Sequence, residues 1–246
     1  MGLKLLLGLC YVLFFIFLPL YDKAYWPEPT KKSLSFKIVA ATMFVAISII
    51  GIFLSGNRTQ FAYTMIMGLV CGWFGDILMH IPSKKNMTCL YIGAAGFLVG
   101  HIFYVAAFVN GAKTLVTNYK FFTLPELIAF IVVYVAFIIM LKPVFKFNFD
   151  SNFLQYGLYL YGIFLVGMLF KVIGFTVTYL KYDADNNIIS AIILIIAGFS
   201  FFISDLTLGI RLLGGRKDSK FIKSLSLYTY FFAQILLSTS ILFIKA

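Results

Sequence analysis

Four ionisable side chains interrupt segments of the chain that are otherwise apolar. Asp76 lies in GLVCGWFGDILMHIP, residues 68–82, Asp205 lies in FFISDLTL, residues 201–208, and His101 and Lys171 have similar surroundings. A charge at the centre of a bilayer costs roughly 2.5–3.5 kcal/mol, so such residues normally face a protein interior or a wet cavity. Two carboxylates in a poorly solvated site can divide acid–base work, because burial and mutual repulsion leave one protonated and the other ionised. We therefore expect Asp76 and Asp205 to compete for one proton at a catalytic site.

Further polar residues recur at helical spacing in apolar segments. In IGAAGFLVGHIFYVAAF, residues 92–108, three glycines accompany His101 and Tyr104 at intervals of three and four, which places them on adjacent faces of a helix and permits close approach of a second helix. The resulting candidates are Asp76, Asp205 and His101 as catalytic residues, and Tyr104, Lys171, Ser204, Tyr230 and Gln234 as substrate-binding residues.

Several of these residues also have purely structural interpretations. His101, Tyr104 and Gln234 could form interhelical hydrogen bonds, and Lys171 could belong to the scaffold. His80, beside Pro82, is expected at the membrane interface, and Glu126 is expected in the first turn of a helix, where the macrodipole favours an acid.

The composition identifies the solvent around these elements as lipid. Hydrophobic residues make up 62% of the chain and charged residues 12%, and the mean hydropathy is +0.98. An average soluble domain is roughly half apolar and a quarter charged. The chain has too few polar residues to cover a soluble core, so we predict an integral membrane protein.

Crossing the hydrocarbon takes about twenty apolar residues. The sequence offers such segments at residues 3–20, 38–54, 62–81, 88–109, 124–141, 154–180, 188–209 and 224–243. We therefore predict an all-α, polytopic transmembrane bundle of eight helices that forms a single domain over residues 1–246. The first segment lacks a small-x-small cleavage site and is expected to be retained as a helix.

The net charge of +11 comes from short basic clusters between the apolar segments, so nucleic-acid binding is not expected. Because basic residues are retained on the cytoplasmic side, the basic loops are predicted to be cytoplasmic and both termini to lie on the other side. The predicted cytoplasmic loops contain Lys23, Lys31, Lys32 and Lys37, then Lys84 and Lys85, then Lys142 and Lys146, and finally Arg211, Arg216, Lys217, Lys220 and Lys223. The three scattered cysteines indicate neither a disulfide framework nor a zinc site.

Four motifs in order, GDILM, GFLVGHIFY, FFISDLTL and YFFAQ, in a chain of eight predicted spans, resemble the YhhN-like family of integral membrane proteins that includes lysoplasmalogenase. The resemblance implies an ether hydrolase that cleaves the vinyl-ether bond of lysoplasmalogens, with a lysophospholipid substrate, membrane lipid around it and no cofactor or metal. It implies a bacterial cytoplasmic membrane or an endomembrane such as the endoplasmic reticulum, and leaves the oligomeric state open. The matching motif residues are Asp76, His101, Tyr104, Asp205 and Gln234, supported by Gly75 and Ser204.

Hydrolysis of a vinyl ether requires an acid that protonates carbon and a group that stabilises the oxocarbenium ion. Paired carboxylates also act on an oxocarbenium-like state in glycoside hydrolysis. Which aspartate is the acid remains open. The substrate phosphate is expected near Lys84, Lys85 and Arg211.

Three alternatives use the same residues. A proton-coupled transporter would also place Asp, Lys and His inside the membrane. A metal could be held by Asp76, Asp205 and His101, although two histidines exclude a three-histidine site. A protein that only associates helices would tolerate loss of both acids.

Overall fold

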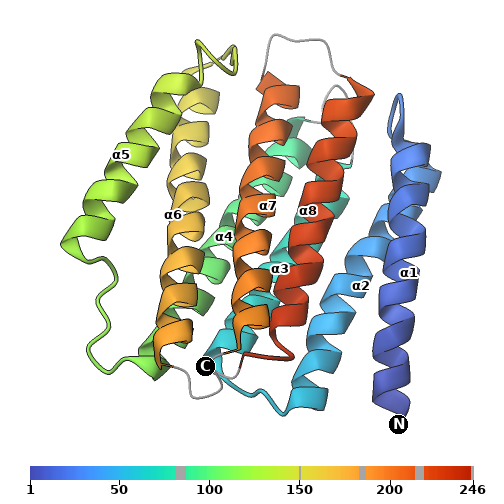
Figure 1. Ribbon diagram of the computed structural model, residues 1–246. Coiled ribbons are helices and arrows are strands. Elements are labelled where there is room, and N and C mark those ends of the chain that lie inside the picture. Colours follow the sequence, from blue (N-terminus) through green and yellow to red (C-terminus); the bar gives the residue numbers. More distant parts are fainter. Residues whose placement is uncertain (81–86, 150, 183–186, 214–218, 245–246) are drawn as a thin grey trace.

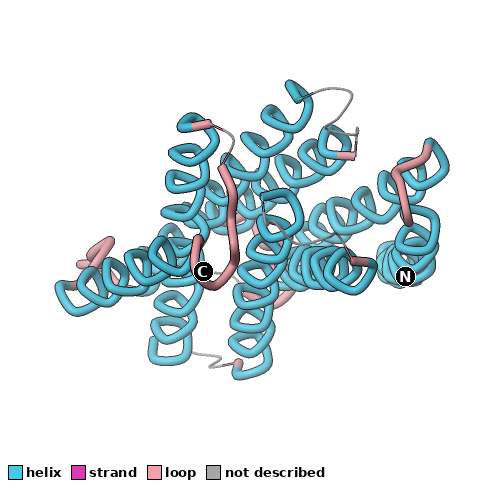
Figure 2. The backbone as a smooth tube through the Cα atoms, turned by 90° about the horizontal axis from the view of Figure 1, so that it is seen from above, coloured by secondary structure: helices cyan, strands magenta, loops and turns pink. Residues whose placement is uncertain are grey.

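The computed structural model describes residues 1–80, 87–149, 151–182, 187–213 and 219–244, and it is helical almost throughout (Figure 1). Seen from above, the chain consists of helices joined by loops at their ends (Figure 2). Its helices are α1 (Gly2–Tyr25), α2 (Lys31–Ser55), α3 (Gln60–Met79), α4 (Met87–Leu115), α5 (Leu124–Met140), α6 (Asn152–Tyr182), α7 (Ile188–Leu213) and α8 (Lys220–Ser240). The predicted all-α bundle of eight helices is confirmed within these residues.

Six of the helices are long and apolar enough to cross a membrane, namely α1, α2, α3, α4, α6 and α7. The other two differ from the predicted spans. α5 has 17 residues, about 26 Å of helix, which is slightly less than the roughly 30 Å of hydrocarbon in a bilayer. α8 is less apolar because its buried face includes polar side chains such as Lys223, Gln234 and Ser238. The chain is a membrane protein whose least apolar helix packs against four other helices.

The loop between α1 and α2 and the loop between α5 and α6 lie at the same end of the bundle, whereas the N-terminus lies at the other end (Figure 1). This arrangement agrees with an alternating path of the chain, and the assignment of the basic end to the cytoplasm stays a prediction. Among the predicted basic loop residues, Lys84, Lys85, Arg216 and Lys217 lie outside the described residues.

Glycines bring α3 and α4 into close contact. A methyl group added at Gly96 would lie 3.5 Å from the carbonyl oxygen of Cys71, and one added at Gly100 would lie 3.3 Å from that of Gly68. Larger residues at these positions would therefore separate the two backbones. α8 lies centrally and contacts α1, α2, α3 and α7, whereas α5 packs against α6. The site is consequently assembled around α3, α4, α7 and α8.

Two capping boxes determine where α2 and α5 begin. At α2 the Thr30 hydroxyl accepts a hydrogen bond from the Ser33 amide at 3.0 Å, while the Ser33 hydroxyl accepts one from the Thr30 amide at 2.8 Å. This cap starts α2 at Lys31, so Lys37 lies inside the helix. A second capping box joins Thr123 to Glu126, which confirms the predicted first-turn position of Glu126.

Candidate active site

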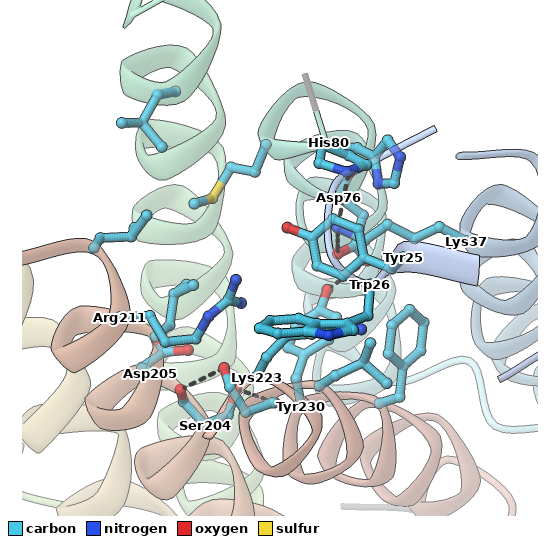
Figure 3. A pocket seen from close by; sticks show the side chains of 18 of the residues that line it. Tyr25, Trp26, Lys37, Asp76, His80, Ser204, Asp205, Arg211, Lys223 and Tyr230 are labelled. Atoms are coloured by element: carbon cyan, nitrogen blue, oxygen red, sulfur yellow. Dashed lines mark hydrogen bonds and ion pairs between the residues drawn. The ribbon is translucent and has the colours of Figure 1, made fainter. Parts of the chain in front are cut away.

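A cavity of about 650 Å³ opens at the end of the bundle that contains the α1–α2 loop (Figure 3). Its walls come from that loop, α2, the ends of α3 and α7, and the starts of α4 and α8. Both candidate aspartates line it. Apolar side chains from α4 and α7, namely Leu90, Leu208 and Leu212, contribute to the wall. The cavity therefore combines carboxyl groups with apolar surface inside the bundle.

Asp76 is surrounded by hydrogen-bond donors. The Lys37 ammonium lies 3.0 Å from Asp76 Oδ1 and also donates to the Asp76 backbone carbonyl at 2.9 Å. The Tyr230 hydroxyl donates to Asp76 Oδ2 at 2.8 Å. Asp76 is only 2% exposed. Both carboxyl oxygens accept from donors and one donor is a cation, so these contacts stabilise the ionised carboxylate against the cost of its burial.

The donor to Asp76 is itself fixed by a buried chain of hydrogen bonds. The Tyr104 hydroxyl donates to Gln234 Oε1 at 2.6 Å, and Gln234 Nε2 donates to the Tyr230 hydroxyl at 2.9 Å. Each group in the chain donates in the same direction, toward Asp76. This polarity leaves the Tyr230 proton directed at the carboxylate and further supports a negative charge there.

Asp205 has a different environment. The Tyr161 hydroxyl donates to Asp205 Oδ2 at 2.5 Å, and His101 Nε2 lies 3.3 Å from the same oxygen. His101 Nδ1 lies 2.8 Å from the Phe97 carbonyl oxygen, which can only accept, so Nδ1 carries a hydrogen. A neutral His101 therefore turns the lone pair of Nε2 toward Asp205. Without a proton between them, the lone pairs of His101 Nε2 and Asp205 Oδ2 would repel each other. One proton shared by the two atoms removes this repulsion, whether it is bonded to the carboxyl group or to the imidazole.

The two carboxyl groups thus have separate partners. The sequence predicted two aspartates competing for one proton, whereas the contacts of the described residues pair Asp76 with Lys37 and Asp205 with His101. Aromatic rings connect the two halves: the Phe201 ring lies 4.8 Å from the His101 ring and 5.7 Å from the Tyr230 ring, centroid to centroid.

The other predicted site residues occupy three kinds of position. Tyr230 and Ser204 line the cavity, and Ser204 also donates to the Ser226 carbonyl at 3.0 Å, which joins α7 to α8. His101, Tyr104 and Gln234 form a fully buried layer behind the cavity wall. The structure therefore brings seven of the eight predicted residues together around one cavity, four in its wall and three behind it: Asp76, Ser204, Asp205 and Tyr230, then His101, Tyr104 and Gln234.

Lys171 is the exception, because it lies away from the cavity. Its ammonium group is 2.8 Å from Glu126 Oε1 and donates to the Phe121 carbonyl. The ammonium also lies over the Phe122 ring, 3.7 Å from its centroid. Lys171 therefore ties α6 to α5 and the loop before it, which corrects its prediction as a substrate-binding residue.

Sequence reasoning missed Lys37 as a partner of Asp76 and Tyr161 as a partner of Asp205. The predicted span begins at residue 38, which assigns Lys37 to the preceding basic loop. The Thr30 and Ser33 capping pair was the signal that could have placed Lys37 inside the helix. Tyr161 gave no comparable signal, since a tyrosine in an apolar helix is common at a membrane interface.

His80 was predicted at the interface, yet it is 4% exposed and lines the cavity. His80 Nε2 lies 3.0 Å from the Ser33 hydroxyl and 3.2 Å from the Thr30 carbonyl oxygen. Burial and the positive charge of Lys37 lower the pKa of His80 to about 4, against the opposing effect of the Thr30 carbonyl. His80 is therefore a neutral member of the cavity wall at physiological pH.

Charged and aromatic residues surround the mouth of the cavity. Arg211 and Lys223 supply cations, Glu28 supplies an acid, and Tyr25 and Trp26 supply rings. Among the described residues, no group of three His, Cys, Asp or Glu side chains is arranged to hold a metal ion.

Comparison with known protein families gives a match over most of the chain. The model of the YhhN family matches residues 32–241, which include every residue of the site except those on the α1–α2 loop and α1. No curated protein and no solved structure matches the chain.

Proposed function

The chain belongs to the YhhN family, and from this premise we propose that it is a membrane hydrolase that cleaves the vinyl-ether bond of lysoplasmalogens. The observation that carries the proposal is that Asp76 and Asp205 line one cavity but have different partners, a lysine for Asp76 and a histidine for Asp205. A reaction that needs both an acid and an anion has both groups available there.

Asp205 is assigned as the general acid. Its contacts with Tyr161 and His101 both use Oδ2, so the proton shared with His101 is held at Oδ2, and this oxygen delivers it to a substrate in the cavity. Asp205 transfers its proton to the vinyl carbon distal to oxygen, and the carbon–oxygen unit becomes an oxocarbenium ion. His101 and Tyr161 hold the carboxyl group in place for this transfer.

Asp76 is assigned as the anion that stabilises the oxocarbenium ion. Lys37 and Tyr230 keep it charged and oriented before substrate enters, so little reorganisation is required during the reaction. Water then adds to the carbon bonded to oxygen, and the proton that water loses restores the carboxylic acid. The hemiacetal breaks its bond to the glycerol oxygen, which takes the hydroxyl proton, and a fatty aldehyde and a glycerophospho-base are released.

The apolar part of the cavity wall is suited to the first carbons of the alkenyl chain. Leu90 of α4 faces the cavity together with Leu208 and Leu212 of α7. Contact between a hydrocarbon chain and apolar side chains is favourable, because it removes apolar surface from water.

The test is aldehyde release from a lysoplasmalogen by detergent-purified protein. Asp205→Asn removes the transferable proton and should lower the rate roughly a hundredfold to ten-thousandfold, the usual contribution of a general acid. Asp76→Asn removes the anion and should also abolish most of the activity. Glu126→Gln, an acid-to-amide change outside the cavity, is the matched control and should retain the rate.

Wild-type rates in both aspartate variants would eliminate the catalytic assignment. Proton uptake into proteoliposomes without aldehyde release would favour the alternative of a proton-coupled carrier. An ester lysolipid offered beside the vinyl ether separates ether hydrolysis from ester hydrolysis in the same assay.

A further inference from the structure

Two cations are held in place at the mouth of the cavity. The Lys223 ammonium lies 3.1 Å from Asp22 Oδ1 and donates to the Asp22 backbone carbonyl at 2.9 Å, and Lys223 is 1% exposed. Both cations also approach the Tyr25 ring: Lys223 Nζ lies 4.5 Å from its centroid and Arg211 Cζ lies 5.9 Å from it. Because these contacts restrain both side chains, an incoming anion would meet charges that are already positioned.

The α1–α2 loop supplies the opposite chemistry at the same mouth. Trp26 is half-buried and Glu28 is exposed, and both line the cavity. An indole ring together with a carboxylate is a combination that binds alkylated or primary ammonium groups, through the negative face of the ring and through charge. Figure 3 shows the Trp26 ring beside the Arg211 side chain in this view.

We propose that this mouth is a two-part headgroup subsite for a zwitterionic phospho-base. Arg211 and Lys223 bind the phosphodiester, and Trp26 and Glu28 bind the ammonium group. The choice of a lysolipid as the ligand rests on the proposed function.

The spacing along α7 relates the subsite to the reacting bond. Arg211 follows Asp205 by six residues, so their Cα atoms are about 9 Å apart along the helix axis at 1.5 Å per residue. Figure 3 shows both side chains on the same side of the cavity. The glycerol unit separates the ether oxygen of a lysolipid from its phosphate by a few bonds. A phosphate bound to the Arg211 side chain therefore leaves the vinyl ether near Asp205.

The charge pattern separates zwitterionic from anionic headgroups. A phosphoglycerol headgroup can place its phosphate between Arg211 and Lys223, but it offers Glu28 hydroxyl groups and no cation. A phosphocholine or phosphoethanolamine headgroup satisfies both parts of the subsite. The subsite therefore predicts a preference that depends on Glu28 and an affinity that depends on Arg211.

The experiment measures binding of saturated ether ligands, which cannot be hydrolysed at a vinyl group, to the full-length protein in detergent. The ligands are a 1-O-alkyl lysophosphocholine, a 1-O-alkyl lysophosphoglycerol and a 1-O-alkylglycerol without phosphate. Arg211→Gln should weaken binding of both phospholipids about tenfold, the size of one hydrogen bond to a charged group, and leave the alkylglycerol unchanged. Glu28→Gln should weaken only the phosphocholine ligand, by about threefold, as expected for an exposed ion pair.

Lys220→Gln is the matched control, because it removes an exposed cation on α8 that does not line the cavity. Arg211→Lys keeps the cation and should retain most of the affinity for both phospholipids. If Arg211→Gln fails to fold, Arg211→Lys tests the phosphate assignment in its place. Equal weakening of all three ligands by Arg211→Gln, or an equal effect of Lys220→Gln, would overturn the phosphate assignment. Equal effects of Glu28→Gln on both phospholipids, or none on either, would overturn the ammonium assignment.

Two competitors distinguish a headgroup site from a site for free phosphate. Glycerophosphocholine should displace the phosphocholine ligand, whereas inorganic phosphate at the same concentration should not, and equal displacement would contradict the two-part site. Binding does not require turnover, so loss of the proposed hydrolase function would leave these results standing. An active hydrolase without this binding pattern would refute the subsite alone.

Discussion

Removing Lys37 should expose how strongly the site depends on its buried ion pair. The Lys37 and Asp76 side chains are 10% and 3% exposed, and their charged atoms are 3.0 Å apart. Coulomb's law at an effective dielectric constant of 20 gives an attraction of about 5 kcal/mol at that distance. Deleting one partner of a buried pair costs about 3–5 kcal/mol, because the remaining charge is left without compensation. Lys37→Met should therefore lower the free energy of unfolding in detergent by about that amount, or leave Asp76 neutralised by a proton and inactive.

The double variant Lys37→Met/Asp76→Asn distinguishes this explanation from simple loss of packing. With both charges absent, no uncompensated charge remains, so the double variant should unfold at a higher temperature than Lys37→Met alone. Lys31→Met, which removes an exposed cation from the same helix, serves as the control. The reasoning is refuted if Lys37→Met changes the free energy of unfolding by less than about 1 kcal/mol and keeps full aldehyde release.

Three further predictions address other parts of the structure. Gly72→Ala would place a methyl group 2.5 Å from Gln234 Nε2 and should lower the free energy of unfolding by about 1–3 kcal/mol and remove most of the activity. Gly157→Ala, whose added methyl group has no other atom within 4 Å, should change neither stability nor activity. Equal thermal unfolding and activity in the two variants would contradict this. The pKa of His80 is lowered from 6.5 to about 4, so between these pH values the unfolded chain binds a proton that the folded protein does not. The free energy of unfolding should therefore fall as the pH falls from 6.5 to about 4, and level off below pH 4. His80→Gln should lose this part of the pH dependence of the unfolding temperature, and an unchanged slope would exclude His80 as its source. Lys171→Met should lower the free energy of unfolding by about 1–3 kcal/mol, since Glu126 loses its ammonium donor, but should retain aldehyde release. If the folded variant released no aldehyde, Lys171 would have to act at the active site.

The helical architecture follows from the sequence to a large degree. Each apolar segment must satisfy its backbone hydrogen bonds within itself in lipid, so its length and composition predict a helix without knowledge of its neighbours. The positions of Gly96 and Gly100 likewise predicted a close helix contact, which α3 and α4 make. Asp76 and Asp205 were predicted to face the interior because an isolated charge is costly in lipid, and both line the cavity.

The proton environment of each carboxyl group was decided only by the tertiary structure. Asp76 is joined to Tyr230, 154 positions away, and Asp205 to Tyr161, 44 positions away. The identity of such partners depends on which helix faces pack together. Local periodicity limits the faces but does not select among them, because any of several buried polar residues could satisfy a carboxylate. The same limit explains Lys171: the sequence showed a cation inside an apolar helix, and only the packing of α5 against α6 directed it to Glu126 and away from the cavity.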